Sequence, residues 1–541
     1  MTENSNVPSL TKYFGTEKEF KDDDRERTES KTIDTISSNR LDHNNGQPEE
    51  PQVCRIFAET PVEPKDPTAA FFDLIGNNLN AVGSAGSGGI MSDLELPNKQ
   101  EDPYIPPVSI SAETDRRRDA WIPNERTRQA LIASMTSAPG TYVPDPDLLT
   151  MPGVLLEEEL GDAIGEAVGY CLGEAEAAQR RALTADDVTQ DERGLRELVQ
   201  AGAYRAAINL TARLLSIYGQ GRGRQGHPTK HSPHSLQLWF TRIALLVKTK
   251  TYSIALAEAE PFEQLEKPDV FFQFYPDMYD GRPGSMAAFS FRLLLSELPM
   301  HCGKPKESLA KLFSILGTVK KMINNLKIGL FEDGNPMEIC ETDRADSLKL
   351  WNGREARVMH SIINCAISIT DYELAMDLLN RLCERDGAPK QALLSALGRL
   401  HLQLGNITGA ETCFSEAVLH GPAGVRDIVD KGLLSIAQNN FDDAYVAFQQ
   451  ASNLEPSNIM VLNNMAVCLL YGGHLKEAIA VLESAISSNP LHALHESLIL
   501  NLCTLYDMES SQGITKKFAL LRQISKYSAD APTAILEKLY G

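Results

Sequence analysis

The chain has 541 residues, and a length in this range suggests two to four domains. Apolar residues make up 42% and charged residues 23%, which is the composition of an ordinary globular protein. The formal net charge of −21 argues against nucleic acid as a main partner, because phosphate groups would be repelled. It argues equally against a broad basic face for anionic lipid.

Cysteine usage and hydropathy indicate the compartment. The nine cysteines are scattered without the close paired spacing of a zinc site, so we expect reduced thiols. The first ten residues contain no apolar run of the secretory type, and no stretch approaches the about 20 apolar residues that span a bilayer. The sequence therefore predicts a cytoplasmic chain without a membrane-spanning segment.

Residues 1–115 are predicted to form a disordered acidic and polar tail. They are rich in Asp, Glu, Asn, Ser, Thr, Pro and Gly and hold few aromatics, so they cannot bury enough apolar area to offset the entropy of ordering. Residues 69–75, which contain Phe71 and Phe72, form an apolar island in this tail. A chance cluster is the favoured interpretation of the island, and a short docking motif is the alternative.

Residues 116–189 are expected to be a helical lead-in, and residues 190–355 to be diverged helix pairs. A Tyr-x-x-Ala spacing recurs at Tyr204 and Tyr252, as at the start of the second helix of a repeat unit. Between them, residues 219–234 hold three basic residues, three histidines and no acidic residue. This segment is predicted to be a solvated basic loop.

The clearest pattern is a set of four residues that occurs three times at a period of 34 residues. This period, with small residues, a large apolar residue and a closing proline, is typical of the tetratricopeptide repeat (TPR). The three copies are Ala410, Phe414, Ala417 and Pro422; Ala444, Phe448, Ala451 and Pro456; and Ala478, Leu482, Ala485 and Pro490.

Small residues also recur 12 positions earlier, at Gly398, Gly432 and Ala466. They are expected on the first helix of each unit, where they allow the second helix to approach closely. The prolines of the quartets should end the second helices, because proline has no N–H and clashes with the preceding turn. We therefore expect TPR units over residues 356–490 and capping helices over residues 491–541.

These patterns predict an all-α fold, an α-solenoid of TPR helix pairs with a long disordered N-terminal tail. Residues one, four and five positions after each small residue of the first helix should face the concave side of such an array. That face is a candidate partner-binding surface, and ordinary solenoid core explains the same residues equally well. The residues are Arg399, Leu402 and Gln403; Leu433, Ile436 and Ala437; and Val467, Leu470 and Tyr471.

No catalytic, cofactor-binding or metal site is expected. Residues 221–226 match G-x-G-x-x-G, but a helical segment rather than a strand precedes them, so they lack the setting of a dinucleotide site. His227, His231 and His234 are close together in a polar loop with no fourth ligand evident. The sequence therefore indicates a binding protein and not an enzyme.

Several motifs outside the repeat pattern match one family. The chain resembles the subunit-12 family of the transport protein particle (TRAPP) complex over about residues 117–541. The motifs are DAWIP at 119–123, LTMPG at 149–153, QDERGLREL at 190–198, GAYRAA at 202–207, SLQLWF at 235–240, NMAVCLLY at 464–471 and HES at 495–497.

This resemblance implies a non-catalytic scaffold subunit of a vesicle-tethering assembly in ER-to-Golgi transport and in autophagy. It implies binding to other large TRAPP subunits and, through them, to the TRAPP core and a Rab-family GTPase. The implied location is peripheral, at the ER–Golgi intermediate compartment and the Golgi. The alternative from the repeats alone is a free-standing TPR adaptor that binds a helical or extended peptide.

Overall fold

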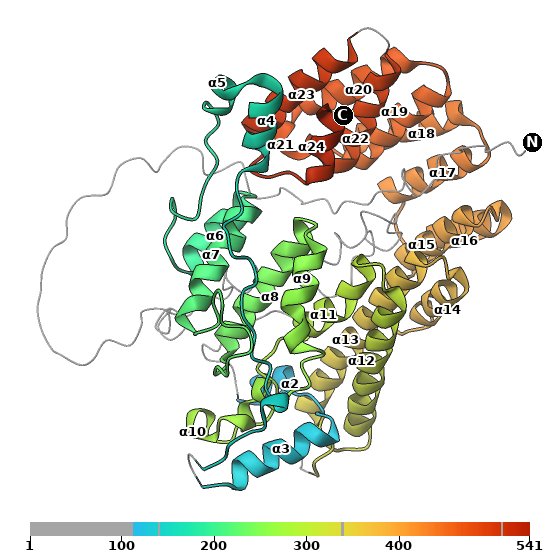
Figure 1. Ribbon diagram of the computed structural model, residues 1–541. Coiled ribbons are helices and arrows are strands. Elements are labelled where there is room, and N and C mark those ends of the chain that lie inside the picture. The colour runs from blue at the N-terminus through green and yellow to red at the C-terminus, as the bar shows by residue number, and fades with distance from the viewer. Residues whose placement is uncertain (1–111, 139–140, 337–339, 510–511, 541) are drawn as a thin grey trace, which may run out of the picture.

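The computed structural model describes residues 112–138, 141–336, 340–509 and 512–540, which fold into helices and loops (Figure 1). The β-bridges in these ranges are two isolated ones, Val154–Arg222 and Phe271–Ser285, so the predicted all-α fold is confirmed. The predicted disordered tail lies outside the described residues, apart from residues 112–115 at the start of the first helix. None of the described helices combines the length and the apolar content that crossing a bilayer requires.

The helices of the N-terminal half include short 3₁₀ turns. They are α2 (Ala112–Asp119), α3 (Glu125–Thr136), η3 (Pro146–Leu148), α4 (Ala163–Leu172), α5 (Glu174–Ala177), α6 (Glu192–Gln200), α7 (Tyr204–Ile217), α8 (Pro233–Lys248), α9 (Tyr252–Ala259), η4 (Glu260–Phe262), η5 (Pro268–Val270), η6 (Phe272–Phe274), α10 (Pro276–Tyr279), α11 (Phe289–His301) and α12 (Pro305–Lys327).

The helices of the C-terminal half are more regular in length. They are α13 (Glu341–Ser368), α14 (Tyr372–Cys383), α15 (Lys390–Gln403), α16 (Ile407–Leu419), α17 (Val425–Ala437), α18 (Phe441–Leu454), α19 (Ile459–Tyr471), α20 (Leu475–Ser488), α21 (Pro490–Ala493), α22 (Glu496–Met508), α23 (Gly513–Tyr527) and α24 (Thr533–Tyr540). In the described residues, helices from both halves of the chain pair in chain order. The pairs are α6/α7, α8/α9, α11/α12, α13/α14, α15/α16, α17/α18, α19/α20 and α22/α23. Residue 355, where a boundary between diverged and regular units was expected, lies inside α13.

One turn geometry joins the helices in seven of these pairs. A residue with a left-handed backbone, with φ between 60° and 86°, lies two positions before each second helix from α7 to α20. The seven residues are Gly202, Lys250, Gly303, Thr370, Gly405, Asn439 and Gly473. Because the geometry is the same in the diverged units and in the regular ones, residues 192–383 are built from the same helix–turn–helix unit.

Small residues of the first helices lie directly beneath large residues of the second helices. A Cβ added to Gly398 would lie 2.4 Å from the ring of Phe414, and one added to Gly432 would lie 2.8 Å from the ring of Phe448. In the next unit the pair is Ala466 and Leu482, both buried in one cluster. A smaller side chain on the second helix thus accompanies a larger one on the first, and the helix spacing is kept.

The other residues of the quartets lie in or beside the same contacts. Ala410, Ala417, Ala444, Ala451 and Ala478 are buried, and Ala485 and Phe414 are half-buried. The prolines follow the second helices: α16 ends three residues before Pro422, and α18 ends two residues before Pro456. Pro490 comes two residues after the end of α20 and is the first residue of α21.

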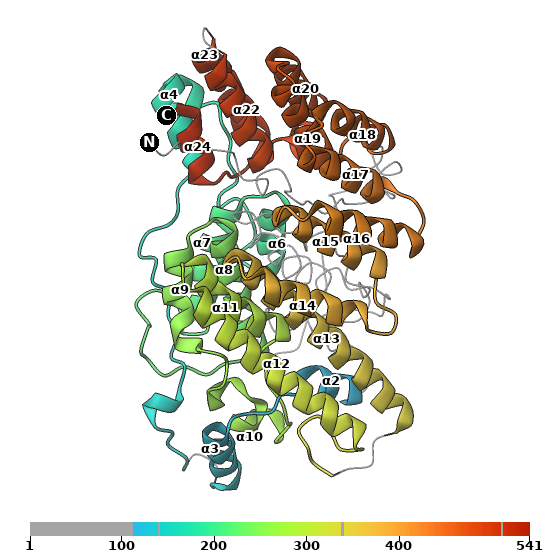
Figure 2. The ribbon, with the colours of Figure 1, turned by 90° about the vertical axis from the view of Figure 1, so that its right-hand side faces the viewer.

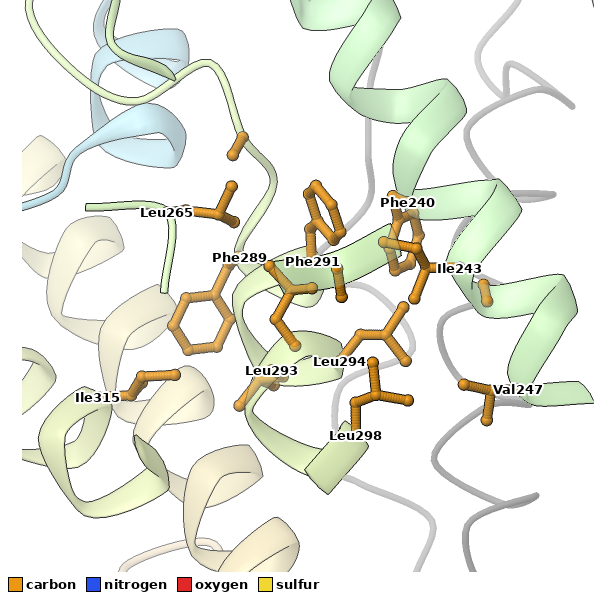
Figure 3. Packing of buried hydrophobic residues seen from close by; sticks show 14 of the residues in the cluster. Phe240, Ile243, Val247, Leu265, Phe289, Phe291, Leu293, Leu294, Leu298 and Ile315 are labelled. Carbon is orange, nitrogen blue, oxygen red and sulfur yellow. The ribbon is translucent and has the colours of Figure 1, made fainter. Parts of the chain in front are cut away.

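The largest apolar core lies in the diverged half, where α8, α11 and α12 meet (Figure 3). Phe240 of α8 and Phe291 of α11 have ring centroids 5.8 Å apart, and Ile315 of α12 closes the other side. The first-helix tryptophan, Trp239, is fully buried in this core. The aromatic residues 271–275 follow η5 and include the 3₁₀ turn η6, and Phe271 is buried in the same cluster.

Main-chain hydrogen bonds hold residues 149–153 against the loop 219–234. The amide of Gly226 donates to the carbonyl of Met151 at 3.1 Å, and the amide of Val154 donates to the carbonyl of Gly221 at 3.2 Å. A Cβ on Gly153 would lie 2.2 Å from the amide nitrogen of Gln225. Only glycine permits this approach, which explains the glycine of the LTMPG motif.

A buried chain of hydrogen bonds fixes the same loop. The indole N–H of Trp239 donates to Gln220 Oε1 (2.7 Å), so the Gln220 amide nitrogen faces His231 Nδ1 (3.3 Å). His231 Nε2 then donates to Thr150 Oγ1 (2.6 Å), which donates to Asp269 Oδ2 (2.7 Å). Burial lowers the pKa of His231, and the neutral ring fits this role. The prediction of a solvated loop is therefore wrong at His231, whose side chain completes a polar network in the core.

The last helices of the array pack against the lead-in segment. Figures 1 and 2 both place α4 beside α23 and α24. Ile164 and Val168 of α4 share an apolar cluster with Leu521 of α23 and Leu539 of α24. The lead-in helix α4 thus packs against the last two helices of the chain.

Arg180, just after α5, stabilises the contact between the lead-in segment and the end of α23. Its guanidinium donates to the carbonyl oxygens of Ser525 (2.5 Å), Ser528 (2.9 Å) and Ala529 (2.8 Å) and pairs with Asp162 at 2.6 Å. A cation at the carboxyl end of α23 satisfies carbonyl groups that have no partner within the helix.

Gly432→Ala should lower the free energy of unfolding by about 1–3 kcal/mol, because the added methyl group meets the fully buried ring of Phe448. Gly317→Ala is the matched control: its Cβ would meet nothing within 4 Å in the middle of α12, so it should gain up to about 1 kcal/mol from helix propensity. Denaturant unfolding of both variants checks this. A loss at position 317 as large as that at 432 would contradict the packing.

Thr370→Gly should stabilise the chain by roughly 0.5–1 kcal/mol, because a β-branched residue is strained at φ 62°. The reciprocal change Gly405→Thr, at φ 74°, should cost about 1–2 kcal/mol. Thermal melts of the two variants measure the effect. A stability loss in both would show that Thr370 is not held in the left-handed region.

Arg180→Ala should cost roughly 2–4 kcal/mol, because it leaves three carbonyl groups and a carboxylate without their cation. Arg128→Ala, which removes an exposed pair with Glu125, should change stability by less than about 1 kcal/mol. Hydrogen exchange at α23 and α24 gives the local readout. Equal effects of the two changes would mean that Arg180 does not hold the C-terminal helices.

Candidate partner-binding surfaces

The residues predicted for the concave face lie mostly between helices. Leu402, Leu433 and Ile436 belong to one buried apolar cluster, and Val467 is also buried. Leu470 is half-buried, and Tyr471 is 43% exposed. Of the named set, Tyr471 is therefore the residue that offers most surface to a partner.

Tyr471 lies at the end of α19 and stacks on Phe441 at the start of α18. Their ring centroids are 4.8 Å apart and the planes are 7° from parallel. The two stacked rings form an aromatic surface between two consecutive units. Such a surface suits an apolar or aromatic contact from a partner.

Arg399 is used within the array. Its Nε lies 2.9 Å from Asp430 Oδ1, and Ser395 donates to the other carboxylate oxygen at 2.5 Å. Both charged side chains are 3% exposed. The pair therefore connects the first helices α15 and α17, and the sequence could not show that a residue 31 positions away would bind the guanidinium.

Exposed leucines lie at or just beyond the ends of three consecutive second helices. Leu419 ends α16 and is 82% exposed, Leu454 ends α18 and is 60% exposed, and Leu491, three residues after the end of α20 in the short helix α21, is 75% exposed. Second helices of stacked repeats run in the same direction, so their ends lie along one edge of the array. We call these three residues the leucine edge; the repeat pattern does not reveal it, because the leucines lie 9, 10 and 13 residues after Ala410, Ala444 and Ala478.

A groove lies between α12, α13 and α14, with a volume of about 360 Å³. We call it the α12–α14 groove. Leu316, Met359 and Leu378 form its buried floor, and the half-exposed ring of Phe313 forms a wall. The groove also contains one acidic and three cationic residues, and the whole lining set is Phe313, Leu316, Gly317, Lys320, Glu355, Met359, Leu378, Arg381 and Arg385.

Three of the described cysteine side chains, Cys365, Cys468 and Cys503, are buried in the core. Burial raises the pKa of Cys468 to about 12 and the pKa values of Cys365 and Cys503 to about 11, so these thiols stay protonated and are poor nucleophiles. In the described ranges, no three residues of the metal-binding types lie close enough together to hold an ion.

The glycine-rich segment 221–226 is also used in packing. It joins α7 to α8 and is bonded to residues 151–154 and 156 through main-chain groups and Arg222. Its amides are not arranged at the start of a helix, which is where a phosphate group would bind. The geometry thus gives the motif a structural role.

Comparison with known proteins agrees with this description. A family model described as a tetratricopeptide repeat matches residues 435–502. Subunit 12 of the trafficking protein particle complex, from mouse (Mus musculus) and from human (Homo sapiens), is in each case 40% identical over 437 residues, which are 80% of this chain. Those residues are 55% of the mouse protein and 59% of the human protein, so the chain spans less than two thirds of their length.

Among solved structures, a tetratricopeptide repeat protein from Parabacteroides merdae is 15% identical, with a TM-score of 0.32. The match covers 57% of this chain and 98% of that one, and a similarity this weak carries no argument. The resemblance drawn from the sequence motifs is confirmed by the two mammalian relatives. The chain carries a tetratricopeptide-repeat domain and is similar, over four fifths of its length, to subunit 12 of the trafficking protein particle complex.

Proposed function

We propose that this chain is a non-catalytic scaffold subunit of a TRAPP vesicle-tethering complex. The observation that supports this most is the 40% identity over 437 residues, because a match of this length must include the lead-in and the diverged units as well as the repeats. These segments carry the closing contacts of the array and the buried network around His231. A relative that shares them shares more than a repeat pattern.

The scaffold role is supported by how the polar groups are used. Buried charges such as the Arg242–Glu258 pair, with Nε and Oε2 at 2.6 Å, bind one another and main-chain groups. Among the exposed apolar residues, Leu419, Leu454, Leu491 and Tyr471 lie in the C-terminal repeats. An array that fixes its charges and exposes apolar contacts is suited to binding other proteins.

In this proposal the leucine edge binds another large TRAPP subunit. Through such subunits the chain is linked to the TRAPP core and to a Rab-family GTPase. It acts in ER-to-Golgi transport and in autophagy, in the cytoplasm and peripherally at the ER–Golgi intermediate compartment and the Golgi. A free-standing adaptor that binds a peptide is the second candidate function, and the α12–α14 groove is the observation that favours it.

Gel filtration of a lysate that contains the tagged full chain tests the proposal. We expect elution in an assembly far larger than the monomer. The triple change Leu419→Glu, Leu454→Glu and Leu491→Glu should move the chain to its monomer mass, because three charges would be desolvated at the contact. Its melting temperature should be unchanged, since all three side chains are exposed.

Val143→Glu is the matched control, since Val143 is 86% exposed and lies outside the repeats. It should leave the elution volume unchanged. Elution of the unaltered chain at its own monomer mass would overturn the assembly proposal and favour the free adaptor. Retention of the triple variant in the large assembly would show that the leucine edge is not the contact.

A further inference from the structure

The α12–α14 groove has the form of a binding site for a short segment with an aromatic anchor. Its floor of Leu316, Met359 and Leu378 is buried, and Phe313 stands beside it with 42% of its surface exposed. A Cβ at Gly317 would meet nothing within 4 Å, so the groove is open at that point. An aromatic side chain placed there would contact the Phe313 ring and cover the floor.

The charge of the groove selects an acidic occupant. Arg385 pairs with Glu355, and Arg381 pairs with Asp377 at 2.9 Å on the surface. Lys320 is exposed, and no ion pair is found for it among the residues that the structure describes. With three cations and one acid in its lining, the groove is positive on a chain whose net charge is −21.

The first described helix, α2, packs on α13, which also lines the groove. α2 is held on α13 by Arg117, which lies 3.3 Å from Asp343, and by Arg354, which donates to the carbonyl of Arg118 at 3.1 Å. Arg354 is followed in sequence by Glu355, which lines the groove. One side of α13 therefore anchors the start of the described residues while another side forms the groove, and Figure 2 places α2 next to α12 and α13.

Residues 69–75, Ala-Ala-Phe-Phe-Asp-Leu-Ile, match the groove in composition and in reach. They combine two aromatic rings with an acid, and residues 59–102 around them hold eight acidic and two basic residues. Only 36 residues separate Ile75 from Ala112. A chain of that length can span at most about 120 Å, which is ample for a site on the neighbouring face of α13.

We propose that residues 69–75 dock in the α12–α14 groove of the same chain. One of the two Phe rings packs against Phe313 above the apolar floor, and Asp73 lies toward Lys320. Because the segment is tethered, its effective concentration is in the millimolar range, so a weak intrinsic affinity is enough to keep the groove covered.

Site-specific photo-crosslinking in the full chain tests this proposal. The photoreactive residue p-benzoylphenylalanine replaces Gly317, and light and ¹⁵N-labelled chains are mixed equally before irradiation. We expect a cross-link to the tryptic peptide 66–99 within one chain, seen as products of a single isotope. The same probe at Thr412, an exposed position on the second helix α16, should give no such link.

The variant Phe71→Ser with Phe72→Ser should lower the cross-link yield about tenfold or more, because the aromatic contact area is lost. Lys320→Glu should lower it as well, and hydrogen exchange at α12 should become faster in the double Phe variant without any probe. A link only between light and heavy chains, a link to another protein in a lysate in place of peptide 66–99, or an unchanged yield in the double Phe variant would each overturn the proposal.

Discussion

The array depends on one recurring contact, in which a residue with little or no side chain on the first helix receives a large side chain from the second. Gly398 accommodates Phe414, and Gly432 accommodates Phe448. This contact brings the two helix backbones close and sets the spacing to which the next unit must conform. Because each unit buries its apolar face only against its neighbours, an error in one contact would be passed along the stack.

Two further sets of contacts connect segments that are distant in sequence. The lead-in helix α4 packs on α23 and α24, and Arg180 satisfies the carbonyl groups at the end of α23. The chain of hydrogen bonds from Trp239 to Asp269 ties the 149–153 segment and the 219–234 loop to α8. The exposed edges and grooves that remain are the surfaces that we propose for partner binding.

Much of the fold could be predicted because its determinants are local. The 34-residue period, the small residues at Gly398 and Gly432, and the turn residues at Gly405 and Gly473 are all visible in sequence. The diverged units kept the same turn while losing its usual residues: Lys250 and Thr370 adopt the left-handed conformation although neither residue type favours it. There the tertiary packing imposes the backbone.

The candidate surfaces were harder to predict because they depend on contacts between distant residues. The sequence pattern placed Arg399 on a partner-binding face, but its side chain forms an ion pair with Asp430. The pattern placed His231 in a solvated loop, but its ring is hydrogen-bonded to Thr150. The α12–α14 groove is formed by three helices from two consecutive units, and no pattern within one helix indicates it.

We propose that the chain works through the shape of an array of helix pairs that binds other subunits. A cryo-EM map of the assembly purified through this chain tests it most directly. The account predicts paired helices from α6 to α23, with α4 against α23 and α24 and another protein along the leucine edge. A map in which α4 lies apart from α23, or in which the leucine edge faces only solvent, would contradict it.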